Sequence, residues 1–153
     1  LTTMDLSDNQ IHAEGGRYLA RGLRENDSLL QLNLRLNRLT DGGCRMLLEG
    51  LQDNVTLTDL NLASNGMGSQ AAQILATIVR DPEHRMNTLT LTGNELTADN
   101  MEILRVSMRT NSSLVSMDLR DNPGYEAEGE AIKEIDARIY KNEIKIRRAG
   151  GHP

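Results

Sequence analysis

The chain has 153 residues, a formal net charge of -5, 25% charged residues and only 2% aromatic residues. This composition excludes a disordered chain, and the negative charge argues against a nucleic-acid binder, which needs a concentrated Lys/Arg surface. No apolar run reaches transmembrane length, so we expect no membrane insertion. Cys44 is the only cysteine; no internal disulfide can form, which predicts a reducing, cytoplasmic compartment.

One short pattern recurs through the chain at spacings of 28 or 29 residues. The copy at Leu57 has apolar residues at Leu57, Leu60 and Leu62, followed by Asn65. Four other segments repeat these positions: Leu1-Met4-Leu6-Asn9, Leu29-Leu32-Leu34-Asn37, Met86-Leu89-Leu91-Asn94 and Leu114-Met117-Leu119-Asn122. Five copies in phase predict a repeat protein.

Each copy predicts a strand of about six residues, a turn at the asparagine, and a helix of about twelve. In the first copy Gly15, Leu19 and Leu23 recur at intervals of four, which is helical spacing, and Asn26–Ser28 form a return loop. The predicted repeats are 1–28, 29–56, 57–85, 86–113 and a partial 114–124. Because residue 1 lies inside a repeat, we expect the chain to be the C-terminal part of a longer array.

The fifth repeat loses the helical register of the others. Ile132, Ile135 and Ile139 still define one helical face. We therefore predict a longer terminal helix over about 126–146 that caps the end of the core, followed by a tail over 147–153. Lys141, Lys145, Arg147 and Arg148 make its end basic, which suits a helix C-terminus.

These leucine and asparagine spacings resemble the leucine-rich-repeat family, and the full helix in each repeat resembles its ribonuclease-inhibitor-like class. The resemblance implies one α/β domain over 1–153, a right-handed solenoid or horseshoe. Its parallel sheet would form the concave face and its helices the convex face, with a C-terminal capping helix. Stacking explains the fold, because one strand and one helix cannot bury their apolar sides alone.

The asparagine that ends each strand has a structural explanation. Where pairing between strands stops, a side-chain amide can satisfy the backbone groups left over. We expect such a ladder along Asn9, Asn37, Asn65, Asn94 and Asn122.

The sequence offers no arrangement typical of catalysis or metal binding. His12, His84 and His152 fall in separate parts of the repeat, and Cys44 has no matching cysteine. We read Cys44 as a small buried spacer. The glycosylation sequons at Asn26, Asn54 and Asn111 share one loop position, so the repeat explains them without sugar. We expect no enzyme activity, catalytic residue, metal, cofactor or small-molecule substrate.

Without catalytic residues, we expect the function to depend on an exposed surface, and we expect a protein partner to bind the concave face. Residues between the inward leucines face the concavity, and Arg is enriched at binding hot spots. The candidate partner-binding residues are Arg35, Leu36, Asp59, Asn61, Asp118 and Arg120.

We interpret the chain as a non-enzymatic protein-interaction scaffold, and several resemblances suggest its setting. Residues 117–122 followed by a long helix resemble the last repeats of ciliary and centrosomal leucine-rich-repeat proteins, such as the repeat subunit of the nexin–dynein regulatory complex. That resemblance implies coiled-coil axonemal or centriolar partners. Five repeats plus a terminal helix also resemble the tropomodulin C-terminal domain, which implies capping of actin pointed ends.

Regulators of enzymes are a third alternative. A GTPase activator of the type that acts on Ran implies an acidic tail, whereas this tail is basic. A ribonuclease inhibitor implies more repeats, many cysteines and tryptophans on the concave face. The sensor array of an innate immune receptor also stays open.

Overall fold

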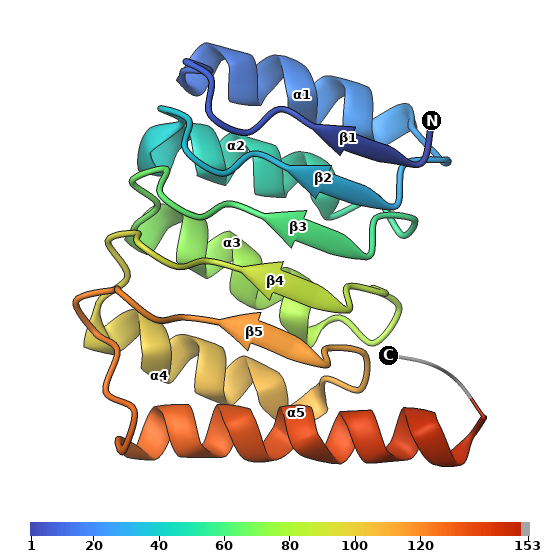
Figure 1. Ribbon diagram of the computed structural model, residues 1–153, viewed down its shortest axis with the longest axis vertical. Coiled ribbons are helices and arrows are strands. Elements are labelled where there is room, and N and C mark those ends of the chain that lie inside the picture. Colours follow the sequence, from blue (N-terminus) through green and yellow to red (C-terminus); the bar gives the residue numbers. More distant parts are fainter. Residues whose placement is uncertain (151–153) are drawn as a thin grey trace.

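The computed structural model describes residues 1–150 as a stack of strand–helix layers (Figure 1). The strands are β1 (Thr3–Asp5), β2 (Gln31–Asn33), β3 (Asp59–Asn61), β4 (Thr88–Thr90) and β5 (Ser116–Asp118). The helices are α1 (Ala13–Glu25), α2 (Thr40–Leu51), α3 (Ser69–Arg80), α4 (Ala98–Ser107), the 3-10 turn η1 (Met108–Thr110) and α5 (Glu130–Arg148). No helix within residues 1–150 is both long and apolar enough to cross a bilayer.

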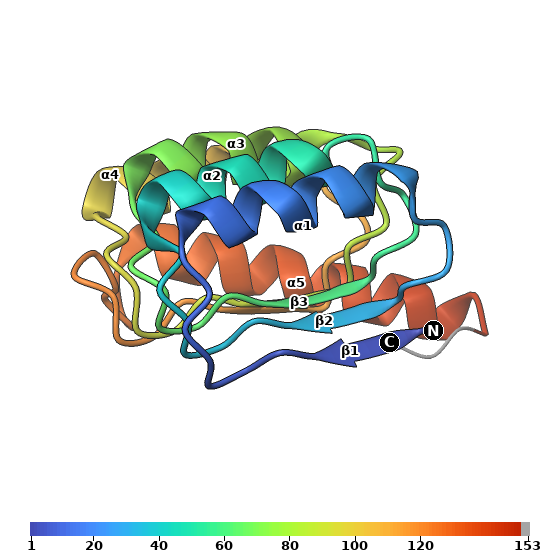
Figure 2. The ribbon, with the colours of Figure 1, turned by 90° about the horizontal axis from the view of Figure 1, so that it is seen from above.

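The five strands form one parallel sheet in the order β1-β2-β3-β4-β5. Helices α1 to α4 all cover the same face of this sheet, and the other face is open (Figure 2). The α/β leucine-rich-repeat solenoid predicted from the repeat spacing is confirmed.

The core runs through the stack between the sheet and the helices. The middle residue of each strand points into it: Met4, Leu32, Leu60, Leu89 and Met117. Leu60 is 1% exposed, whereas its neighbours Asp59 and Asn61 point the other way, because side chains alternate along a strand. The leucines therefore hold neighbouring layers together and leave the alternate residues on the open face.

The strands are three residues long, half the expected length. Backbone pairing continues past them, as in Leu34 N–H donating to Asn61 O at 2.9 Å. The chain then turns at a residue with positive φ, 57° at Leu36, a conformation that ends an extended strand. The same bend recurs at Asp8, Ser64, Gly93 and Asp121.

Buried asparagines bridge the layers at these turns. Asn65 Nδ2 donates to Leu34 O of the preceding layer at 2.8 Å, and Asn94 Nδ2 donates to Leu62 O at 3.0 Å. Asn37 and Asn122 donate in the same way to Leu6 O and Leu91 O. Asn9, in the first layer, donates to the carbonyls of Leu6 and Ser7 in its own turn, and within residues 1–150 it has no bond to another layer.

A second asparagine column, which the sequence reading missed, lies at the other end of the strands. Asn54 Nδ2 donates to Leu23 O at 2.8 Å, while Asn54 Oδ1 accepts from Leu57 N–H at 2.9 Å. Asn111 repeats the pattern two layers later, toward Val79 O. Both asparagines are buried, so their sequons are closed to glycosylation in the folded chain.

The loop between α3 and β4 puts a histidine in this column. His84 is buried, and its Nε2 lies 2.9 Å from Leu51 O at the end of α2. Asn100, which departs from the small residues of earlier repeats, is also explained: it accepts from Thr97 N–H at 2.9 Å and completes a capping box at the start of α4.

The terminal helix α5 covers the last layer (Figure 1). Its predicted start near residue 126 is wrong by four residues, because Gly129 N–H donates to Glu126 O at 2.9 Å and closes a turn before the helix begins. It ends two residues after the predicted end near 146 and so includes Arg147 and Arg148, whose charge suits the helix C-terminus. The last part of the expected tail, 151–153, lies outside the described residues.

Candidate protein-binding face

The open face of the sheet carries two aligned columns of outward side chains. Strand pairing places Asp59 beside Gln31 and Thr88, and Asn61 beside Asn33 and Thr90. The full columns are Thr3, Gln31, Asp59, Thr88, Ser116 and Asp5, Asn33, Asn61, Thr90, Asp118. All ten are polar, so the face is a continuous hydrogen-bonding surface across five strands.

Asp59 and Asn61 line a shallow hollow of about 330 Å³ in the middle of this surface. Thr58 Oγ1 donates to Asp59 Oδ2 at 2.8 Å. Asn61 Oδ1 accepts from Ala63 N–H at 3.0 Å and so holds the end of β3. No hydrogen bond within residues 1–150 uses the Asn61 Nδ2 group, so Asn61 offers a partner its two N–H donors.

Asp118 and Arg120 form a bidentate ion pair at the β5 end of the face. Arg120 Nε donates to Asp118 Oδ1 at 2.9 Å, and a terminal guanidinium nitrogen donates to Oδ2 at 2.6 Å. These hydrogen bonds hold the pKa of Asp118 below its usual value and raise that of Arg120. The Arg120 side chain is still 68% exposed, so the fixed guanidinium can contact a partner.

This ion pair adjoins residues that the sequence reading did not select. Asp118 and Arg120 line a hollow of about 250 Å³ together with Tyr125 and Asp136. Burial raises the pKa of Asp136. The sequence gives one indication of the position of Asp136. It lies on the terminal helix four residues after the inward-facing Ile132, and so on the same side of that helix.

Arg35 and Leu36 lie at the other side of the face, just after β2, and both are exposed. Arg35 forms no ion pair within residues 1–150. Leu36 has a φ of 57°, which costs a non-glycine residue about 1–2 kcal/mol. Strands β3 and β4 lie between this pair and Arg120, a separation of about 14 Å at ordinary strand spacing. The candidate residues therefore form three groups across the sheet: Arg35 with Leu36, Asp59 with Asn61, and Asp118 with Arg120.

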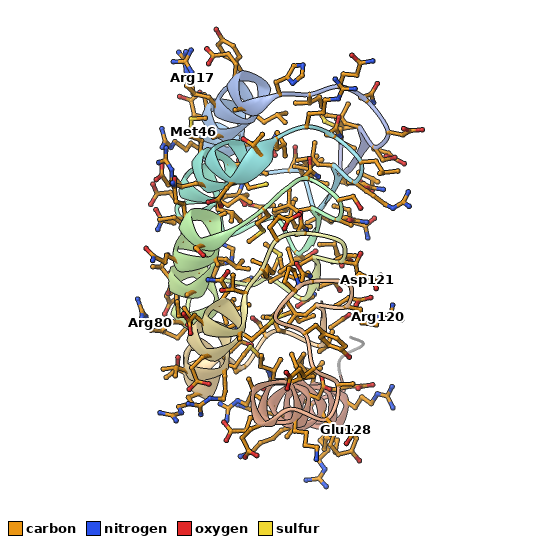
Figure 3. The ribbon with its side chains drawn as sticks, turned by 90° about the vertical axis from the view of Figure 1, so that its left-hand side faces the viewer. Arg17, Met46, Arg80, Arg120, Asp121 and Glu128 are labelled. Atoms are coloured by element: carbon orange, nitrogen blue, oxygen red, sulfur yellow. The ribbon has the colours of Figure 1, made fainter. Side chains whose placement is uncertain are left out.

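The face is well separated from the helices. Figure 3 shows Arg120 and Asp121 on the side opposite Arg17, Met46 and Arg80, which come from α1, α2 and α3. A partner on the sheet therefore does not contact the helical side of the same layers.

The remaining reactive side chains do not gather on this face. Cys44 is buried in α2, where burial raises the pKa of its thiol to about 12. His12 and His84 lie at different turns, and His152 falls outside the described residues. Within residues 1–150, no three His, Cys, Asp or Glu side chains are grouped to hold a metal ion.

Comparison with known proteins agrees with this architecture. A family model described as Leucine Rich repeat matches residues 1–20, 25–48 and 53–76. The match covers the first three strand–helix layers, and the fold of the chain is a leucine-rich-repeat solenoid. No curated protein sequence matches the chain.

Two solved structures are similar to the chain in fold. One is described as leiomodin-1 actin-binding site 2, with a TM-score of 0.80 and 14% identity, covering 97% of this chain and 84% of that one. The other is a tropomodulin C-terminal domain from Caenorhabditis elegans, with a TM-score of 0.57 and 16% identity, covering 88% of this chain and 98% of that one. At these identities the likeness concerns the fold alone.

Proposed function

We propose that residues 1–153 act as one non-catalytic protein-binding unit, of the ribonuclease-inhibitor-like class, that holds its partner on the open face of the sheet. The observation that carries the proposal is the strand register. It aligns ten polar side chains in two columns on the side of the sheet opposite the apolar core. A rigid, preorganised surface loses little conformational entropy on binding.

Two groups would anchor the partner. Arg35 forms no ion pair within residues 1–150, and the neighbouring Leu36 is an exposed large apolar side chain. At the β5 side, Arg120 is fixed by Asp118 and adjoins Tyr125. Arg and Tyr are the residue types that dominate measured hot spots. The polar pair Asp59 and Asn61 between them would fix the partner's register.

Actin is the specific partner that we rank first, in a cytoplasmic, cytoskeletal setting. Its support is the likeness in fold to a leiomodin-1 structure described as an actin-binding site, which extends over nearly the whole chain. A second candidate partner is a coiled-coil subunit of a ciliary or centrosomal assembly. Its support is the run 117–122 followed by the long helix α5.

Charge reversal at the two anchors tests the face. We expect Arg35→Glu with Arg120→Glu to weaken sedimentation with actin at least tenfold while the melting temperature changes little, because both side chains are exposed. The matched control is Arg24→Glu with Arg80→Glu, which makes the same charge change on α1 and α3. If both variants lose the same affinity for actin, the partner does not bind through the open face of the sheet.

Pyrene-actin depolymerisation from pointed ends separates capping from binding to actin monomers or filament sides. Slowing by the unmodified protein and not by the Arg35/Arg120 variant would support capping. If actin neither sediments with the protein nor depolymerises more slowly, actin is excluded. The ciliary candidate is then tested by affinity purification with the same two variants.

A further inference from the structure

A basic hollow of about 290 Å³ lies where α5 packs beside α4 and the turn η1, at the end of the stack (Figure 1). Its charged lining consists of four cations and one carboxylate: Arg105, Arg109, Arg138, Lys141 and Glu134. The formal net charge of the whole chain is -5. The hollow therefore concentrates positive charge on an otherwise acidic molecule.

One of the four cations, Arg105, is already neutralised by carboxylates. Its guanidinium pairs with Glu102 of the same helix, and a second nitrogen of the group lies 2.7 Å from Glu134 of α5. The Arg105 side chain is only 16% exposed. It therefore joins α4 to α5 and does not face a partner.

The other three cations form no ion pair within residues 1–150. Arg138 Nε donates to the backbone oxygen of Asn111 at 2.9 Å, which fixes the Arg138 side chain beside the end of η1 but leaves its charge unbalanced. Arg109 and Lys141 are exposed, and in the described part of the chain their side chains make no hydrogen bond. Three positive charges thus face one hollow without a carboxylate of their own.

The helix macrodipole does not explain these charges. Cations stabilise the last turn of a helix, and Arg109 follows the end of α4 in this way. Arg138 and Lys141, however, lie in the middle of α5 (Glu130–Arg148), where the macrodipole has little effect. Like charges around so small a hollow also repel one another, because they lie within the Debye length of about 10 Å. An anion in the hollow would relieve this repulsion.

We propose that this hollow binds an acidic peptide segment of a protein partner, with neighbouring carboxylates placed against Arg109, Arg138 and Lys141. Met108 and Ala137 supply an apolar part of the lining, against which the aliphatic stem of a glutamate can pack. The hollow is lined by residues of α4, η1 and α5 and by no strand residue. The inference therefore does not depend on the proposed function of the open sheet face.

The lining favours a peptide over the other polyanions of the cell. Binding of single-stranded nucleic acid commonly uses aromatic side chains on which bases stack, and the lining contains no aromatic residue. Binding to a membrane surface uses large apolar side chains beside the cations, whereas Met108 is only 1% exposed. A peptide carboxylate can form two parallel hydrogen bonds with a guanidinium, and Arg109 has that group available.

The test uses the 153-residue chain and a short fluorescent peptide of repeated glutamate–glutamate–leucine units. Fluorescence anisotropy should show binding that weakens as the salt concentration is raised through about 0.15 M, because salt screens exposed charges. Arg109→Gln with Lys141→Gln should weaken binding about tenfold, since two of the three facing charges are lost. The Arg138 hydrogen bond to Asn111 stays in place in this variant.

Two controls separate a binding site from general charge and from a structural role. Arg21→Gln with Arg24→Gln removes the same charge from exposed positions on α1 and should leave the affinity for the peptide unchanged. The Arg109/Lys141 variant should melt no lower than the unmodified protein, because it loses no ion pair formed within residues 1–150. A structural role for these cations would lower the melting temperature instead.

Amide NMR locates the bound peptide. The largest shifts on adding it should fall in residues 105–111 and 134–141. Shifts confined to α1 or to the strands would refute the proposal, as would an equal loss of affinity in the α1 variant. Equal binding of a peptide with glutamine in place of glutamate would also refute it, because charge would then play no part. If vesicles of phosphatidylserine and phosphatidylcholine bind the protein and the glutamate peptide does not, the hollow contacts a membrane and the proposal is wrong.

Discussion

Replacing Asn94 by alanine should destabilise the whole stack, because this one side chain serves two layers. Asn94 Nδ2 donates to Leu62 O and Leu91 O at 3.0 Å each, and Oδ1 accepts from the N–H groups of Asn65 and Met67 at 3.0 Å each. Asn94 is 3% exposed, so water cannot replace these bonds without opening the turn.

The expected loss of stability follows from the two backbone N–H groups, of Asn65 and Met67, that lose their acceptor. A buried donor left without an acceptor costs about 1–3 kcal/mol, so the loss of both acceptor contacts in Asn94→Ala should lower the free energy of unfolding by about 2–6 kcal/mol. Domains of this size are stable by about 5–15 kcal/mol. Urea unfolding followed by circular dichroism should therefore show a midpoint about 1–2 M lower.

Asn9→Ala is the matched control. Asn9 is exposed, and its side-chain bonds in the described part of the chain stay within its own turn, to the carbonyls of Leu6 and Ser7. Water can replace both bonds, so we expect a loss below about 1 kcal/mol. If the two variants lose the same stability, the buried asparagines do not hold the layers together in the way described.

Three further predictions concern the core and the ion pair. Leu60→Asp should prevent cooperative unfolding, since it buries an unpaired charge. Ser116→Asp on the open face should keep the native melting curve, because Ser116 is exposed and pairs with the uncharged Thr88. Cys44 should react with a thiol reagent at pH 8 only after denaturation, since the buried thiol, with a pKa of about 12, stays protonated. The pKa of Asp118 lies below its usual 3.8 in the folded chain. Because the unfolded chain binds more protons in that range, the contribution of Asp118 to stability is present above about pH 3.8 and is lost as the pH falls through the folded pKa. Carboxyl NMR should find this pKa restored to its usual value in Arg120→Gln.

The architecture could be predicted from the sequence because the same pattern of apolar residues and asparagine occurs five times. Leu60 and its equivalents predicted the inward positions, and the residues beside them predicted the outward columns, since side chains alternate along a strand. Strand length was not predictable, because the bend at Leu36 needs a positive φ that leucine seldom adopts.

The contacts of the site were less accessible from sequence. The pair Asp118–Arg120 depends on rotamers that a spacing of two residues does not specify. Tyr125 and Asp136 lie beside that pair because the chain turns after β5 and α5 then packs at the end of the stack. The structural role of Asn54 was not recognised from sequence. Asn54 begins a glycosylation sequon in the loop between repeats, and nothing in that motif indicates its hydrogen bonds to Leu23 O and Leu57 N–H.

Amide hydrogen exchange, measured with and without the bound partner, shows which face of the sheet the partner covers, and actin is the partner to use first. We expect slower exchange in residues 31–36, 59–63 and 116–121, with exchange in α2 and α3 unchanged. Slower exchange confined to helices α1 to α4 would place the partner on the opposite side of the sheet and refute binding on its open face.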